Sequence, residues 1–280
     1  MTAGADPGGP GPDPGDLRRE LRAYYRPLLP LWDRTLAERG DLPLWRWAAG
    51  RWGDRAALEL GAGSGRVTEV LAGEVRPLVA VDLNPDALRE ARRRLSGAGA
   101  AHLVLADMRT LRLARRFDLV VAANDPFSHL RTDRGRERAL ARVAEHLAPG
   151  GSFLLDALWF PEAFRRDAAR PGGTTTERRT PGGEEGPPLV VRNTWRCDPD
   201  TGRCTARFEC RREGEVVARS LFHGRCWTRE EVADRLGRAG LRVDELWGDY
   251  GRGPWDPDAS EHMVVRASPD PGRGRGPPGP

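Results

Sequence analysis

Three glycines stand at every second position between two apolar segments of the chain. The strand-like run AALEL, residues 56–60, leads into Gly61, Gly63 and Gly65, and the segment GRVTEVLAGEV continues with a helical pattern. Glycine inside a strand or helix is destabilising by roughly 0.5–1 kcal/mol relative to alanine. A glycine cluster at this junction therefore predicts a turn where a ligand approaches the backbone closely.

Strand-like and helix-like segments alternate on both sides of this turn. Several of the strand-like segments are apolar throughout, which is typical of a parallel sheet covered by helices on both faces. The sequence therefore predicts an α/β fold. The predicted strands are 56–60, 77–82, 101–107, 116–124, 152–158, 241–248 and 261–268.

Capping residues mark the starts of several predicted helices. Asp16 and Asp41 precede two helical segments near the N-terminus, and Asn84 precedes a third that has proline at its first position. Thr228 and Glu231 have the spacing of a capping box. We expect residues 16–55 to form a helical lid.

The alternation is interrupted after Phe160. Residues 171–227 contain a segment with the composition of a mobile loop, followed by three strand-like runs joined by the turns DPDTG and REGE. We expect an antiparallel β-meander inserted into the α/β fold. The insert also contains all four cysteines, Cys197, Cys204, Cys210 and Cys226. None has Cys-x-x-Cys spacing, so we expect reduced thiols and no metal.

The charge distribution does not indicate a nucleic-acid partner. The formal net charge is +4, and all basic residues are arginines that are interleaved with acids along the predicted helices. No apolar run approaches the ~20 residues that span a bilayer, and no secretory signal is recognisable. We therefore expect a cytoplasmic protein without membrane contact, whose domain covers residues 16–267 between disordered tails at 1–15 and 268–280.

Four polar residues lie at the ends of four successive predicted strands: Glu59, Asp82, Asp107 and Asn124. Ligands of open α/β sheets bind at these carboxyl ends. A carboxylate at Asp82 can accept both hydroxyl groups of a ribose. Asp107 can accept an adenine amino hydrogen while the thioether of Met108 packs on the ring. The pattern indicates a nucleoside site.

The motifs LELGAGSGR, VAVDLN, LADM, FDLVVAANDPFSHL and HLAPGGSFLLD, between Leu42 and Arg266, resemble those of class I S-adenosylmethionine-dependent methyltransferases. The resemblance implies a Rossmann-like seven-stranded sheet of order 3-2-1-4-5-7-6 with the last strand antiparallel. It also implies S-adenosyl-L-methionine as cofactor. The cofactor-binding residues that we expect are Glu59, Gly61, Ala62, Gly63, Gly65, Arg66, Asp82, Leu83, Asp107, Met108 and Asn124.

The N-terminal segment DLPLWRW, the motif PFSHL and the predicted meander look most like the corresponding parts of methyltransferases with small-molecule acceptors. We therefore expect N- or O-methylation of a small molecule by direct in-line transfer, in a monomer or homodimer. The alternatives are a protein or RNA acceptor, a non-catalytic cofactor-binding protein, and a nicotinamide-dependent oxidoreductase. Arg66 disfavours the last, because the dinucleotide fingerprint has its third glycine at this position.

Catalytic candidates follow the fourth strand. His129 is a candidate base or orienting group, with a polar loop cap as the alternative. Asp125 is a candidate for binding an acceptor amine, with turn formation before Pro126 as the alternative. A magnesium site at Asp125 and Asp156 lacks the rest of an acidic cluster, so we expect no metal.

Some further side chains have two interpretations each. Arg66 either pairs with the cofactor carboxylate or faces solvent. The remaining aromatic candidates either line the site or belong to the core: Tyr24, Tyr25, Trp45, Trp247, Tyr250 and Trp255.

Overall fold

The computed structural model describes residues 14–32, 40–97, 101–180 and 186–272. Most of the two predicted tails lies outside these ranges. Where the ranges do overlap the tails, the first helix begins at Pro14 and the last strand continues to Pro269.

The predicted seven-stranded sheet is present with the predicted order. It runs β3-β2-β1-β4-β5-β11-β10, in which β10 and β11 are the sixth and seventh strands of this sheet. β1 pairs in parallel with β2 and β4, whereas β11 is antiparallel to both β5 and β10. The strands are β1 Ala57–Leu60, β2 Leu78–Asp82, β3 Ala101–Leu105, β4 Phe117–Ala122, β5 Leu147–Ala157, β10 Leu241–Trp247 and β11 Met263–Pro269.

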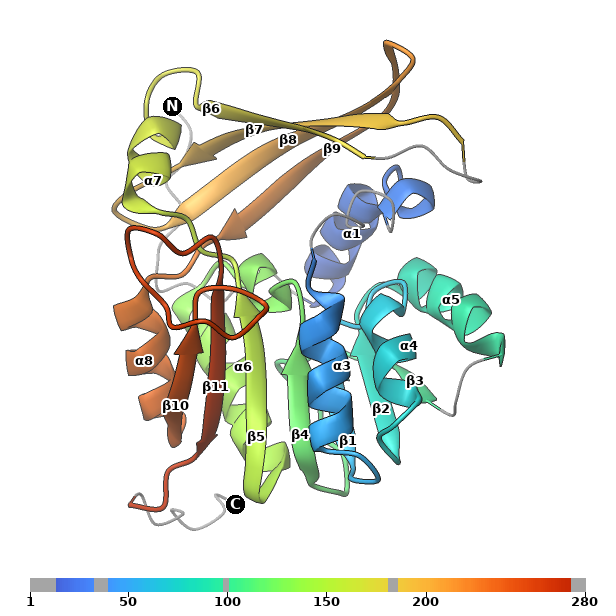
Figure 1. Cartoon of the computed structure of the whole chain (residues 1–280), viewed down its shortest axis with the longest axis vertical. Helices are drawn as coiled ribbons and strands as arrows, with labels where there is room; N and C mark the ends of the chain where they lie inside the picture. Colours follow the sequence, from blue (N-terminus) through green and yellow to red (C-terminus); the bar gives the residue numbers. More distant parts are fainter. Residues whose placement is uncertain (1–13, 33–39, 98–100, 181–185, 273–280) are drawn as a thin grey trace.

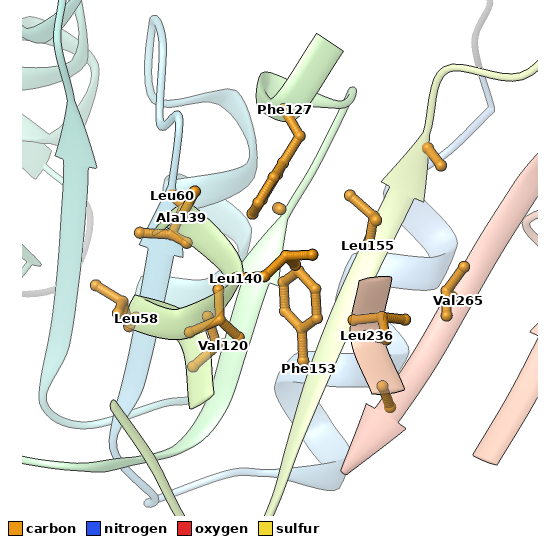
Figure 2. Packing of buried hydrophobic residues seen from close by; sticks show 14 of the residues in the cluster. Leu58, Leu60, Val120, Phe127, Ala139, Leu140, Phe153, Leu155, Leu236 and Val265 are labelled. Carbon is orange, nitrogen blue, oxygen red and sulfur yellow. The ribbon is translucent and has the colours of Figure 1, made fainter. Parts of the chain in front are cut away.

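Helices cover both faces of this sheet, as the apolar strands predict. On one face the strands pack against α6 and α8, and Figure 2 shows Leu140 beside Val120, and Leu236 between Leu155 and Val265. On the other face the alternate strand residues pack against α3 and α4. The helices are α3 Leu42–Arg51, α4 Arg66–Ala72, α5 Pro85–Arg94, α6 Asp133–His146 and α8 Arg229–Arg238.

The insert is a separate antiparallel sheet of order β6-β7-β8-β9. Three of its strands were predicted. The fourth, β6, lies in the segment predicted as a mobile loop. Its three consecutive threonines favour an extended strand, and β7 provides the strand with which it pairs. Helix α7 was also not predicted. The elements are α7 Glu162–Ala168, β6 Thr174–Arg179, β7 Leu189–Cys197, β8 Arg203–Arg212 and β9 Glu215–Arg225.

The first helix, α1 Pro14–Tyr25, connects the two sheets (Figure 1). Its Tyr24 carbonyl accepts a hydrogen bond of 2.6 Å from the Ser220 hydroxyl of β9. α1 ends before the predicted residue 29, because a residue before proline, here Arg26, disfavours helical backbone. A short 3-10 helix, η1 Leu29–Leu31, follows.

Two of the predicted side-chain caps form, and two do not. Asn84 accepts from the Asp86 amide at 3.0 Å, and Thr228 accepts from the Glu231 amide at 3.1 Å. Asp16 lies inside the first turn of α1. Asp41 occupies the N-cap position of α3 without a side-chain cap bond, because its carboxylate is held elsewhere.

The four cysteines are buried free thiols. Among the residues that the structure describes, no helix is both long and apolar enough to cross a bilayer.

Candidate active site

A cavity of about 990 Å³, including the open solvent at its mouth, lies at the carboxyl ends of the parallel strands. Its floor comes from the glycine turn and the ends of β2 and β4. Its other walls include Leu17, Leu21 and Tyr25 of α1, and Trp32. The predicted cofactor residues that line it are Glu59, Gly61, Ala62, Gly63, Arg66, Asp82, Leu83, Asp107, Met108 and Asn124.

The three glycines of the turn have different physical roles. All have positive φ, with values of 75° at Gly61, 57° at Gly63 and 84° at Gly65. A Cβ at Gly61 would lie 2.4 Å from Cβ of Pro126, and a Cβ at Gly65 would lie 2.9 Å from Cβ of Ala91. A Cβ at Gly63 would have nothing within 4 Å. Gly63 therefore leaves room for a ligand, whereas Gly65 does not line the cavity and lets α4 approach α5.

Asp82 is held rigidly at the end of β2. One carboxylate oxygen accepts from the Gly63 amide at 2.8 Å, and the other accepts from the Asn84 amide at 2.7 Å. Burial raises the pKa of the carboxyl group, and these amide hydrogen bonds lower it in part. The two bonds fix the orientation of the group, and each oxygen keeps a second lone pair for a ligand hydroxyl.

Glu59 lies beneath the glycine turn. It accepts a hydrogen bond of 2.6 Å from the Thr68 hydroxyl. Burial above all, with the neighbouring Asp82, raises the pKa of the Glu59 carboxyl to about 8 against the lowering effects of the Thr68 hydrogen bond and of Arg66. Glu59 is therefore largely protonated at neutral pH, which limits the negative charge in this part of the cavity.

Arg66 does not face solvent. Its guanidinium donates to both oxygens of Asp41, at 2.8 and 2.7 Å, and Asp41 also accepts from the Trp45 indole at 3.0 Å. The side chain lines the cavity while this bidentate pair holds it in place. The pair also joins α3 to α4, and it explains why Asp41 does not cap α3.

The adenine-side candidates are also positioned by their neighbours. The Asp107 carboxylate accepts from the Arg109 guanidinium at 2.7 Å and from the Arg109 amide at 2.8 Å. Met108 follows on the cavity wall. Asn84 is buried, and its Nδ2 has no hydrogen-bond partner among the described residues. Leaving this enclosed donor unpaired costs free energy.

His129 and Tyr25 form a pair that also lines the cavity. Their Nε2 and Oη atoms are 3.1 Å apart. Burial, together with the nearby Arg131, lowers the pKa of His129 to about 4. Burial raises the pKa of Tyr25. Both groups are therefore neutral at physiological pH.

Asp125 does not line the cavity. Its carboxylate accepts from the Leu158 amide and from the Trp227 indole, both at 2.8 Å. Asn124 and Asp125 both have positive φ, of 54° and 38°. The turn thus directs Asp125 away from the site and into the protein, which favours its turn-forming interpretation over the catalytic one.

Sequence reasoning missed a buried network around Arg136. The guanidinium lies 3.8 Å from the centroid of the Trp227 ring and donates to the Leu130 carbonyl at 3.0 Å. It also donates to Glu231 at 3.2 Å. The network holds the loop that bears His129. Arg136 is one of several similar arginines in α6, so no local signal distinguishes it.

The other aromatic candidates belong to the core. Trp45, Trp247 and Tyr250 are buried in the α3 face, and Trp255 packs against Trp159 with ring centroids 5.5 Å apart. Tyr24 is buried against the insert sheet. Within the described ranges, no three His, Cys, Asp or Glu side chains gather closely enough to hold a metal ion.

Comparison with known proteins agrees with this geometry. A family model described as a methyltransferase domain matches residues 57–151. The chain is 32% identical over 207 residues to a dTDP-3-amino-3,4,6-trideoxy-alpha-D-glucopyranose N,N-dimethyltransferase of Streptomyces venezuelae, covering 70% of this chain and 79% of that protein. It is 30% identical over 203 residues to a dTDP-3-amino-3,6-dideoxy-alpha-D-glucopyranose N,N-dimethyltransferase of Streptomyces fradiae, covering 70% and 74%.

A solved structure with bound S-adenosylmethionine shares the fold. It is CalS10, an amino pentose methyltransferase from Micromonospora echinaspora, with a TM-score of 0.64, 23% identity, and coverage of 85% of this chain and 95% of that one. The glycine turn and the fixed Asp82 carboxylate offer the space and the hydrogen-bond acceptors that S-adenosylmethionine would need. This chain belongs to the S-adenosylmethionine-dependent methyltransferases.

Proposed function

We propose that the protein methylates the amino nitrogen of a small-molecule acceptor, an amino sugar. The observation that carries this proposal is the neutral Tyr25–His129 pair, which lies in the same cavity as Asp82 and Gly63. The printed activities of the two Streptomyces relatives, both N,N-dimethyltransferases of amino sugars, support it.

The cofactor would be held by residues on the sheet side of the cavity. Asp82 accepts the ribose hydroxyls, Gly63 leaves space beside the backbone, and Met108 packs on the base. When bound, S-adenosylmethionine supplies an electrophilic methyl group on a positively charged sulfur.

The acceptor nitrogen would lie at the Tyr25–His129 pair. An apolar wall disfavours charged groups, so an amine enters this part of the cavity in its neutral, nucleophilic form. In either tautomer of His129, the two side chains together retain a lone pair that accepts a hydrogen bond from the amine N–H of the methyl acceptor. The two residues thus orient the amine, and orientation accounts for up to about 7–11 kcal/mol of a barrier in well-aligned systems.

The shape of the cavity favours a small acceptor over a protein or an RNA. α1 and η1 contribute Leu17, Leu21 and Leu29 to its walls. Of the predicted lid at 16–55, we therefore propose that α1 and η1 act as the cover. α3 serves the core instead, because it packs against α4.

Kinetics of two variants test the proposal. We expect Tyr25→Phe and His129→Gln to lower kcat on amino sugars by roughly a hundredfold, the lower end of the range for positioned proton acceptors. Tyr24→Phe is the matched control, because Tyr24 does not line the cavity. Cofactor affinity, measured by calorimetry, should be unchanged in all three variants. Equal turnover of the corresponding hydroxy sugars, or unaltered kcat in both variants, would refute the proposal.

A further inference from the structure

Three of the four cysteines gather at one end of the insert sheet. Cys197 is the last residue of β7, Cys204 is the second residue of β8, and Cys226 directly follows β9. The Cys204 thiol is in hydrogen-bond contact with the thiols of both Cys197 and Cys226. Cys210 is separate from this cluster, because it lies further along β8 at a distance of about 20 Å for a strand.

The strand register places Cys197 and Cys204 directly opposite each other. The next pair towards the turn is hydrogen-bonded, because the Asp198 amide donates to the Arg203 carbonyl at 2.8 Å. Hydrogen-bonded and non-hydrogen-bonded pairs alternate along an antiparallel ladder, so Cys197 and Cys204 form a non-hydrogen-bonded pair. The Cα atoms of such a pair are about 4.5 Å apart, which lies within the range of about 4.4–6.8 Å that a disulfide spans.

Cys226 is less well placed to form a bond with Cys204. Its amide donates to the Gly202 carbonyl at 3.0 Å, and its thiol donates to the same carbonyl at 3.3 Å. Cys226 is therefore opposite Gly202, and Cys204 is its diagonal neighbour, for which the Cα distance is about 7–8 Å. A disulfide across more than about 7 Å requires the backbone to move. Of the two thiols that contact Cys204, the thiol of Cys197 has the geometry of a disulfide partner.

A small molecule can reach this pair from solvent. Cys197 and Cys204 line a hollow of about 730 Å³, including open solvent, at the end of the insert sheet. Arg131, two residues after His129, lines the same hollow. The two cysteines are otherwise enclosed, with exposed fractions of 6% and 3%. The hollow therefore admits a small oxidant, whereas burial keeps the two thiols from meeting a thiol of a second protein molecule.

We infer that Cys197 and Cys204 are a redox modification site, at which a peroxide oxidises the two thiols to an intramolecular disulfide between β7 and β8. Hydrogen bonds to Cys197 and Cys226, together with burial, raise the pKa of Cys204, so Cys197 is the residue that attacks as a thiolate. With hydrogen peroxide, its sulfur becomes a sulfenic acid, the O–O bond breaks, and the released hydroxide takes up the thiol proton as water. The Cys204 sulfur then displaces the sulfenic hydroxyl group, which leaves with the Cys204 proton as a second water. Two electrons pass from the two sulfurs to the peroxide.

Peptide mapping tests this inference without any methyl transfer. Trypsin cleaves after arginine and places the cysteines in the separate peptides 197–203, 204–207, 208–211 and 226–229. The reduced full chain is treated with hydrogen peroxide, its remaining thiols are alkylated, and the digest is analysed by mass spectrometry. We expect peptide 197–203 to be linked to peptide 204–207, and the intact chain to lose the mass of two hydrogen atoms. Dithiothreitol should restore both thiols, and the other two peptides should be recovered in alkylated form.

Single replacements of the cysteines provide matched controls. Cys197→Ser and Cys204→Ser should lose the linked peptide. Cys210→Ser should keep it, because this residue lies outside the cluster on the same strand. Cys226→Ser should also keep it, because the serine hydroxyl can still donate to the Gly202 carbonyl. Circular dichroism of each variant before oxidation shows whether it is folded, and the map of the unaltered chain does not depend on any variant.

Three results would overturn the inference. Peroxide would leave all four peptides unlinked, whether as alkylated thiols or as sulfinic and sulfonic acids. The Cys204 peptide would be linked to the Cys226 peptide instead of the Cys197 peptide. The link would form only at high protein concentration, which indicates a bond between two chains. None of these results bears on the proposed methylation, because the inference does not depend on it.

Discussion

Replacing single glycines of the turn separates ligand binding from stability. In Gly63→Ala the new residue keeps a φ of 57°, and left-handed backbone costs a non-glycine residue about 1–2 kcal/mol. The added methyl group meets no protein atom within 4 Å. We therefore expect a folded protein whose unfolding free energy is lower by about 1–2 kcal/mol.

The methyl group of Gly63→Ala instead occupies space that the cofactor needs. Overpacking by one methyl group costs about 1–3 kcal/mol, which in a complex weakens binding by about 5- to 150-fold. Calorimetric titration with S-adenosylmethionine measures this change, and urea unfolding measures the stability.

Gly65→Ala is the matched control. Its Cβ would lie 2.9 Å from Cβ and 3.0 Å from Cα of Ala91, so overpacking adds to the backbone cost and the total is about 2–5 kcal/mol. The folded fraction should keep its cofactor affinity. The reasoning is refuted if Gly63→Ala binds the cofactor as the parent does, or if Gly65→Ala loses as much affinity.

Three further predictions concern buried polar groups. Trp227→Phe removes a 2.8 Å bond to the Asp125 carboxylate and should lower the unfolding free energy in urea by about 1.5–3 kcal/mol; an unchanged midpoint would contradict this. Arg66→Ala leaves Asp41 buried without its guanidinium and should cost about 3–5 kcal/mol, and adding Asp41→Asn should restore part of it; no restoration would show that the charge is not responsible. Because the Glu59 pKa is raised from 4.5 to about 8, its contribution favours the folded state below pH 4.5 and is lost as pH rises through 8. Denaturant midpoints of Glu59→Gln should fall less than those of the parent between pH 5 and 8, and parallel curves would contradict this.

The order of the main sheet was implied by the resemblance to class I methyltransferases, whereas the alternation of strands and helices, the glycine turn and the caps at Asn84 and Thr228 could be predicted from local patterns in the chain. These features depend on backbone sterics and on hydrogen bonds between residues two or three positions apart, such as Asn84 with Asp86. Apolar runs such as FDLVVA need cover on both faces wherever they occur. Local physical chemistry is therefore sufficient for them.

Only the tertiary structure decided the partners of the polar side chains. Arg66 meets Asp41 across 25 positions, and Asp125 meets Trp227 across 102. Strand β6 likewise exists because β7 lies beside it. The sequence singled out Arg66 and Asp125 as site candidates but gave no indication of these partners, and Arg136 has the local signal of an ordinary surface residue. Their roles follow from burial, because a buried charge is costly unless it is paired. Which residue becomes the partner depends on how the whole chain folds.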